Sequence, residues 1–189
     1  MKYDSEKHRR RSIRLKGYDY SQSGGYCVTI VTQNRECLFG DISDGVMVLN
    51  DAGNMVEKIW KEIPKFYSNF VIDTFQIMPN HLHGILNIVG ADPRVCPDDN
   101  QDRNLGQPQG VAPTLSLGDV IKRFKTLTSK LYIDGIKQNN WQPFHRKLWQ
   151  RNYWEHIIRD ESDLLHIREY INNNPLEWEL DNENPNYFA

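Results

Sequence analysis

The sequence predicts an α+β fold in which strands and helices follow one another in the order β-α-β-β-α-β, with one more helix at the end. Three observations lead to this order: runs of β-branched and aromatic residues, two apolar runs joined by a short turn, and three stretches in which apolar residues recur at helical spacing. A chain of 189 residues, of which 39% are hydrophobic, can bury a core without disulfides. We therefore expect one domain with flanking segments.

The first strand and the first helix are predicted near the start of this domain. Residues 26–32 are rich in β-branched and aromatic side chains, and residues 46–49 add a short second run. Asn50 and Asp51 offer an N-cap, and apolar residues then recur at helical spacing up to Pro64. We therefore expect a helix that ends at Pro64.

A hairpin and a second helix are predicted in the middle of the chain. The apolar runs at residues 70–78 and 82–89 are separated by a Pro-Asn pair, which favours a turn. Residues 90–115 are rich in Asp, Asn, Gln, Gly and Pro, which indicates a long polar loop. A capping-box pattern at Ser116 precedes an apolar stripe that continues to Ile133, and this pattern predicts a helix.

The last strand and the last helix are predicted near the C-terminus. Residues 148–159 have strand character because aromatic and β-branched side chains are frequent there. Asp160 or Ser162 can cap a final helix, which the Asn-Asn-Asn-Pro sequence at residues 172–175 ends.

These elements fit a ferredoxin-like split βαβ sandwich with an extra C-terminal helix. In that arrangement two β-α-β halves share one antiparallel sheet, both helices cover one face, and every crossover is right-handed with a short connection. The expected domain covers residues 25–175. It follows a basic N-terminal leader, residues 1–24, and precedes an acidic C-terminal tail, residues 176–189.

The composition argues against a membrane protein and against a secreted one. No apolar stretch has the length of a membrane span, and the N-terminal residues are charged where a signal peptide would be apolar. The three cysteines cannot all pair and show no Cys-x-x-Cys spacing, which suits a reducing compartment. We expect a cytoplasmic protein without membrane partners.

The formal net charge of -2 hides an uneven distribution of charge. Lys and Arg are concentrated in residues 1–20 and 121–151, whereas acids dominate residues 161–189. Basic residues interleaved with aromatic and amide side chains suit a phosphate backbone. Basic clusters by themselves, however, are more typical of ordinary solvated surfaces than of a nucleic-acid-binding site.

His81 and His83 are the first candidates for a functional site. Alternate residues of a strand point to the same side, so both imidazoles should leave one face of the sheet. Two adjacent imidazoles supply half of a metal site, but a histidine in a sheet is more often a hydrogen-bonded structural residue. The pair alone leaves both roles open.

Tyr170 and Asn174 are the second candidates. Residues four apart share one face of a helix, with Cβ atoms roughly 6 Å apart. If the last helix packs against the sheet through its apolar stripe, this face can overhang the two histidines. The alternative is that Tyr170 is a packing residue and that Asn174 only marks the helix end.

The sequence MPNHLHG at residues 78–84, followed by YINNNP at residues 170–175, resembles the single-tyrosine HUH transposases, in particular the REP-associated tyrosine transposases. Segments at residues 26–40 and 149–159 add to the likeness, which covers most of the chain up to Pro175. The family fold is ferredoxin-like, in agreement with the order of elements predicted above.

The resemblance implies a transposase-like endonuclease that nicks and rejoins single-stranded or hairpin DNA by metal-dependent transesterification. It implies that Tyr170 forms a 5′-phosphotyrosine and that His81, His83 and Asn174 bind Mg²⁺ or Mn²⁺, with Asn173 as the rival third ligand. Family members occur as monomers and as dimers, so a homodimer is one of the two expected states.

Phosphate contacts are expected from basic residues of the leader, of the second helix and of the segment before the last strand, namely Arg9, Arg10, Arg11, Arg14, Lys122, Arg123, Lys125, Arg146 and Lys147. Trp141 or Trp149 is expected to stack on bases. Trp60, Trp154 and Trp178 are expected to pack in the core or against the tail.

Two alternative functions remain. One is a non-catalytic nucleic-acid-binding module on a ferredoxin-like sheet, although no strand carries the aromatic signature of RNA-recognition domains. The other is a metal-dependent hydrolase that uses His81 and His83 with Asp73 or Glu155. Replacing Tyr170 by Phe separates the three readings, because only the nuclease needs the phenol oxygen.

Overall fold

The computed structural model describes residue 15, residues 17–89 and residues 115–187. Most of the expected leader and of the expected polar loop lie outside the described residues. The strands are β1 (Gly24–Val31), β2 (Gly40–Ser43), β3 (Val46–Leu49), β4 (Phe70–Ile77), β5 (His81–Ile88) and β6 (Trp154–Ile158). The helices are α1 (Asp51–Lys61), α2 (Ile63–Phe66), α3 (Leu117–Asn139) and α4 (Glu161–Asn173), with short 3-10 turns η1 (Gln33–Arg35) and η2 (Trp178–Leu180). None of the helices in this part of the chain is long and apolar enough to cross a membrane.

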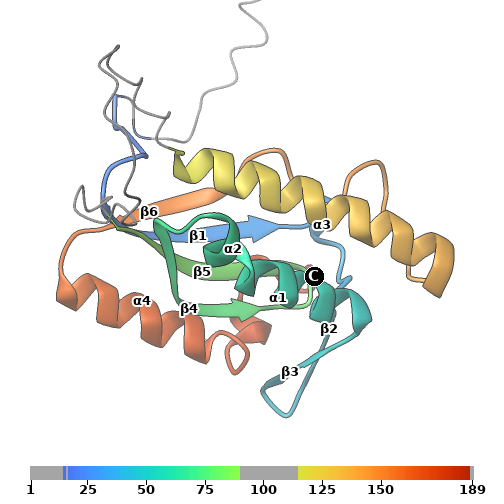
Figure 1. The fold of residues 1–189 in the computed structure, drawn as a ribbon. Coiled ribbons are helices and arrows are strands. Elements are labelled where there is room, and N and C mark those ends of the chain that lie inside the picture. The colour runs from blue at the N-terminus through green and yellow to red at the C-terminus, as the bar shows by residue number, and fades with distance from the viewer. Residues whose placement is uncertain (1–14, 16, 90–114, 188–189) are drawn as a thin grey trace, which may run out of the picture.

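The main sheet confirms the predicted ferredoxin-like arrangement (Figure 1). Its strand order is β4-β5-β1-β6, and every neighbouring pair is antiparallel. In the chain, α1 lies between β1 and β4, and α3 lies between β5 and β6, which produces the two β-α-β halves. The strand β5, which contains both histidines, is therefore an inner strand with neighbours on both sides.

The alternation of side chains along the strands divides the core into two layers. On one face, Val28 of β1 packs with Trp60 of α1 and Phe124 of α3. On the other face, Cys27 of β1 packs with Ile171 of α4. The additional helix α4 thus lies across the sheet from α3 (Figure 1), on the face to which the odd-numbered residues of β1 and β5 point.

The predicted helix starts are confirmed by their caps. The side chain of Asn50 accepts a backbone hydrogen bond at the start of α1. Ser116 and Asp119 form the expected capping box of α3, and Asp160 caps α4. Such caps satisfy backbone N–H groups that have no partner inside the helix, and each stabilises a helix by about 1 kcal/mol.

Two predicted boundaries are wrong. Pro64 does not end the helical region but lies in the first turn of α2, where the N–H group that proline lacks is not needed. The predicted strand over residues 148–159 is shorter, because regular pairing is confined to β6 and only an isolated bridge joins Thr32 to Trp149. In addition, β2 and β3 form a separate two-stranded ribbon, of which only the second strand was predicted.

Candidate active site

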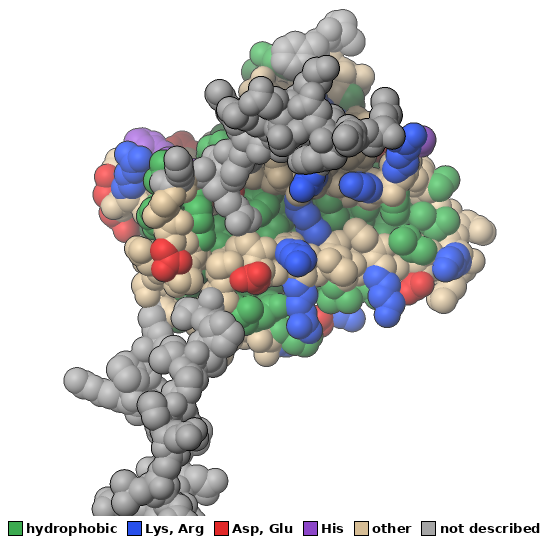
Figure 2. All heavy atoms as spheres, turned by 90° about the horizontal axis from the view of Figure 1, so that it is seen from above, with side chains coloured by type: hydrophobic (Ala, Val, Ile, Leu, Met, Phe, Trp, Pro, Cys, Tyr) green, Lys and Arg blue, Asp and Glu red, His purple; other side chains and the backbone are tan. Residues whose placement is uncertain are grey.

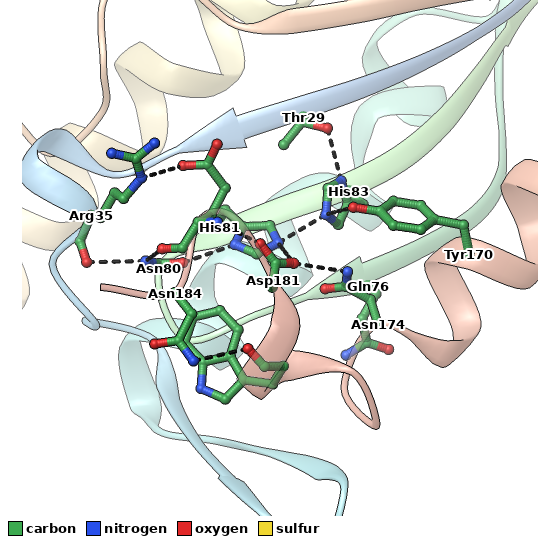
Figure 3. A network of polar contacts seen from close by, with 12 residues as sticks. Thr29, Arg35, Gln76, Asn80, His81, His83, Tyr170, Asn174, Asp181 and Asn184 are labelled. Atoms are coloured by element: carbon green, nitrogen blue, oxygen red, sulfur yellow. Dashed lines mark hydrogen bonds and ion pairs between the residues drawn. The ribbon is translucent and has the colours of Figure 1, made fainter. Parts of the chain in front are cut away.

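His81 and His83 lie side by side on the face of the sheet that α4 covers (Figure 3). Both imidazoles are buried, and their Nε2 atoms are 2.9 Å apart. Burial lowers the pKa of His81 to about 3, and the adjacent Asn174 opposes this shift only in part. Burial and the proximity of His81 hold the pKa of His83 well below its usual range. Both rings are therefore neutral at neutral pH, the form that binds metal ions.

Asn80 and Thr29 orient the two imidazoles. The Nδ2 group of Asn80 donates to two backbone carbonyl oxygens at 2.7 and 3.0 Å, so its Oδ1 atom faces His81 Nδ1 at 2.8 Å. Because His81 Nδ1 must donate this hydrogen bond, Nε2 of the neutral ring carries a lone pair, which faces His83 Nε2 and can bind an ion in place of that contact. Thr29 Oγ1 lies 2.8 Å from His83 Nδ1 and holds the second ring.

Tyr170 reaches the histidine pair from α4 (Figure 3). Its hydroxyl oxygen lies 3.3 Å from His83 Nε2, and the side chain is 48% exposed, so that a phosphate can approach from outside. Burial, followed by the charge of Asp181, raises the pKa of Tyr170 to about 12. The phenol is therefore protonated at neutral pH, and its activation as a nucleophile requires help from the site.

Two oxygen donors lie beside the imidazoles, the predicted Asn174 and also Asp181, which the sequence reasoning missed. Each of His81, His83 and Asp181 offers one ligand atom, and these three atoms lie within 4.8 Å of one another, so this cluster can hold a metal ion. Asn174 Nδ2 donates to Asp181 Oδ2 at 2.9 Å, while Asn174 Oδ1 is buried and makes no hydrogen bond with a described residue.

A buried carbonyl oxygen without a partner is costly, and an ion on the histidines would provide that partner. The donor set combines imidazole nitrogen with amide and carboxylate oxygen, which divalent ions accept. The residues present therefore fit the divalent metal that the family resemblance implies.

A pocket of about 360 Å³ opens in front of Tyr170 and His83, between α4 and the segment that follows it. The charged residues that the structure describes around this pocket are three acids, Glu177, Asp181 and Glu183. Like charges repel, so a phosphate could enter only if a cation offset these carboxylates. The electrostatics of the pocket thus agree with its fit to a metal ion.

Those predicted basic contacts that the structure describes are separated from this pocket by the sheet. Lys122, Arg123 and Lys125 belong to α3, and Lys125 lines a groove of about 620 Å³ with Arg146 and Lys147. Arg123 turns away from the groove and lies 5.7 Å from an aromatic ring centre of α2. The remaining predicted contacts, Arg9, Arg10, Arg11 and Arg14, lie outside the described residues.

The roles predicted for the tryptophans are partly wrong. Trp149 is 4% exposed and belongs to the core, and Trp141 packs edge-on against Tyr132, because the segment before β6 folds back onto α3. Trp60 is buried in the core as predicted. Trp154, which was expected to pack, is 53% exposed and lines the pocket, because it begins an edge strand.

Asp73, one of the two acids that the hydrolase alternative would use with the histidines, is engaged elsewhere. Asp73 accepts hydrogen bonds from Arg168 at 2.6 and 2.9 Å, and this contact with the guanidinium lowers the pKa of the carboxyl. The carboxylate beside the two imidazoles is Asp181.

The fold and the site together define an HUH-type arrangement, in which a ferredoxin-like sheet carries a His-x-His pair on an inner strand and a tyrosine approaches it from a covering helix. No family model matches the chain. An uncharacterised protein of Haemophilus influenzae is 46% identical over 181 residues, which cover 95% of this chain and 96% of the relative, and the two proteins belong to one family.

A predicted REP-associated tyrosine transposase of the same organism is 27% identical over 158 residues, which cover 84% of this chain and 73% of the relative. A solved structure of a REP-associated tyrosine transposase bound to a REP hairpin has the same fold, with a TM-score of 0.55 and 18% identity over 88% of this chain and 74% of that one. The chain is thus similar to the REP-associated tyrosine transposases, and the resemblance predicted from its motifs is confirmed.

Proposed function

We propose that this protein is a transposase-like single-stranded DNA endonuclease and strand transferase that acts on hairpin or palindromic DNA. The observation that carries the proposal is the 3.3 Å separation between Tyr170 Oη and His83 Nε2 in an open pocket. The likeness to REP-associated tyrosine transposases, one of which was solved with a REP hairpin, supports hairpin DNA as the substrate.

Tyr170 is the proposed nucleophile. Its phenol oxygen loses its proton and attacks phosphorus, the bond between phosphorus and the 3′ oxygen breaks, and the 3′ oxygen takes up a proton. The products are a 5′-phosphotyrosine and a free 3′-OH end. Because one phosphate ester replaces another, a second 3′-OH can reverse the step and join two strands without a nucleotide cofactor.

His81, His83, Asn174 and Asp181 are the proposed ligands of Mg²⁺ or Mn²⁺. Such an ion would polarise the scissile phosphate and stabilise the charge that develops on the leaving oxygen. The protein's own contribution is to hold two neutral imidazoles with their Nε2 atoms together, which Asn80 supports by fixing the tautomer of His81.

The groove along α3 is the proposed contact for the phosphate backbone. Lys and Arg side chains gather on the face that is seen from above, with few acids between them (Figure 2). Lys125 is a weaker candidate than its charge suggests, because its ammonium donates to two backbone carbonyl oxygens and burial lowers its pKa to about 8. Arg146 and Lys147 are exposed and are the preferred contacts.

A direct test mixes the purified protein with hairpin oligonucleotides labelled at the 3′ end in the presence of Mn²⁺. We expect a protein–DNA adduct that survives denaturing electrophoresis, because the label stays on the strand joined to tyrosine. A chelator should prevent its formation. Tight DNA binding without an adduct under any of these conditions would contradict the nuclease and support the non-catalytic binding module.

Replacing both Arg146 and Lys147 by Gln should weaken DNA binding and flatten its salt dependence. Each phosphate contact contributes about 0.7 to 0.9 to the slope of log K against log salt concentration, so the slope should fall by about 1.4 to 1.8. Fluorescence anisotropy over a series of KCl concentrations measures this slope. The matched control replaces the exposed Lys58 and Lys65 of α1 and α2, and an equal change in that control would contradict a groove-specific role.

A further inference from the structure

Trp154 places a large aromatic ring at the rim of the pocket that contains Tyr170. It is the first residue of the edge strand β6 and pairs with Thr29 of β1. Cross-strand partners share one face of a sheet, so Trp154 lies on the same face as Thr29, whose hydroxyl contacts His83. The indole is 53% exposed and lines the pocket together with Tyr170 and Asp181.

Neighbouring groups hold this exposed indole in a defined orientation. The rings of Trp154 and His156 are nearly parallel, with an interplanar angle of 12° and 5.9 Å between their centroids. His156 Nε2 is in turn fixed by the carboxylate of Asp163, with oxygens at 2.8 and 3.1 Å. Asp163 lies in the first turn of α4, the helix that carries Tyr170, so the indole and the phenol are tied to the same element.

The chemistry of the pocket indicates what this ring can bind. Apart from Tyr170 and the aliphatic Leu180, the other walls offer carboxylates, amides, a hydroxyl and an imidazole, so the indole is the flat apolar surface next to the proposed nucleophile. Nucleobases present such a flat face, and stacking on aromatic side chains is tolerant of base identity. In a duplex both faces of each base are already stacked, so the ring selects an unpaired base.

We propose that Trp154 is the stacking platform for an unpaired nucleobase next to the phosphate that Tyr170 attacks. This inference rests on the proposed function, since it assigns the base-binding part of the same site. Trp154 touches the base and positions the backbone, while Tyr170 carries the chemistry. The inference also accounts for an indole left exposed at the mouth of a polar pocket.

The test places 2-aminopurine at successive unpaired positions of a hairpin oligonucleotide and measures its fluorescence with the Tyr170→Phe protein, which cannot react. We expect quenching at one or two adjacent positions, because stacking on an indole quenches 2-aminopurine. Adding Trp154→Ala should abolish this quenching and weaken binding about 5- to 150-fold. Adding Trp154→Phe should preserve binding within about 5-fold, since a phenyl ring also stacks.

The matched control is Leu165→Ala, which removes an apolar side chain of similar exposure, 54%, from α4. We expect no change in affinity or quenching, and circular dichroism should show the same thermal transition for every variant. Equal quenching with and without the indole, or no quenching at any position, would overturn the inference even if the wild-type protein forms the covalent adduct. Absence of the adduct together with position-specific quenching would instead overturn the proposed nuclease and leave the stacking site standing.

Discussion

Replacing Tyr170 by Phe should abolish the covalent protein–DNA adduct while leaving DNA binding within about 2-fold of the wild type. The substitution removes one oxygen from a side chain that is 48% exposed, so it should not disturb the core. The hydroxyl makes its contact with His83 Nε2 at 3.3 Å, and no other part of the phenol can attack phosphorus. Loss of a covalent nucleophile costs orders of magnitude in rate, and we expect a fall of more than about 1,000-fold.

The matched control for this variant is Tyr187→Phe, which removes a hydroxyl from another tyrosine that is 41% exposed. That protein should form the adduct at the wild-type rate. Retention of the adduct in the Tyr170 variant would show that another residue is the nucleophile, and retained cleavage without an adduct would favour the metal-dependent hydrolase. If the wild-type protein forms no adduct either, and both proteins bind DNA equally well, the binding module is favoured.

The order of elements could be predicted from the sequence because local signals determine it. Asn50, Ser116 and Asp160 mark helix starts by side-chain hydrogen bonds that span only three residues. The shared face of His81 and His83 follows from the alternation of a strand. Pro64 misled the prediction because the same residue that ends one helix is well tolerated in the first turn of the next.

The parts of the site that escaped prediction depend on contacts between distant residues. Asp181 is one of many acids in the C-terminal segment, and no local pattern distinguishes it from the others. It reaches the histidines because its segment is anchored to the sheet, for example by the hydrogen bond from Asn80 to the backbone of Glu183, 103 residues away. Sequence motifs and their spacing do not predict such contacts between residues far apart in the chain.

The exposure of Trp154 was equally out of reach, since it depends on the place of β6 in the sheet. The strand order puts β6 at an edge, which leaves the outer flank of its first residue uncovered. In an inner strand the same residue would have had a neighbouring strand on both sides. Gly84 illustrates the converse, because a Cβ there would lie 2.5 Å from the ring of Trp60, and only the packed structure explains why the histidine motif is followed by glycine.

Replacing either His81 or His83 by Ala should remove most of the affinity for Mn²⁺. The two Nε2 atoms are 2.9 Å apart on one strand, and their neutral rings are oriented by Asn80 and Thr29, so each supplies a preorganised ligand. Loss of groups that only orient a ligand already weakens metal binding 10- to 100-fold, and we therefore expect a loss of more than about 100-fold here. Isothermal titration with Mn²⁺ alone, without DNA, measures this directly.

The control for the metal titration is His166→Ala, which removes an exposed imidazole from α4 and should leave Mn²⁺ affinity unchanged. Because each variant also leaves a gap under α4, its thermal transition must be compared with that of the wild type before a loss of affinity is assigned to ligation. A folded protein that lacks one imidazole and still binds Mn²⁺ with wild-type affinity would show that the histidine pair does not bind the metal. The 2.9 Å contact would then be a hydrogen bond within the core, the structural role that a histidine on a strand usually has.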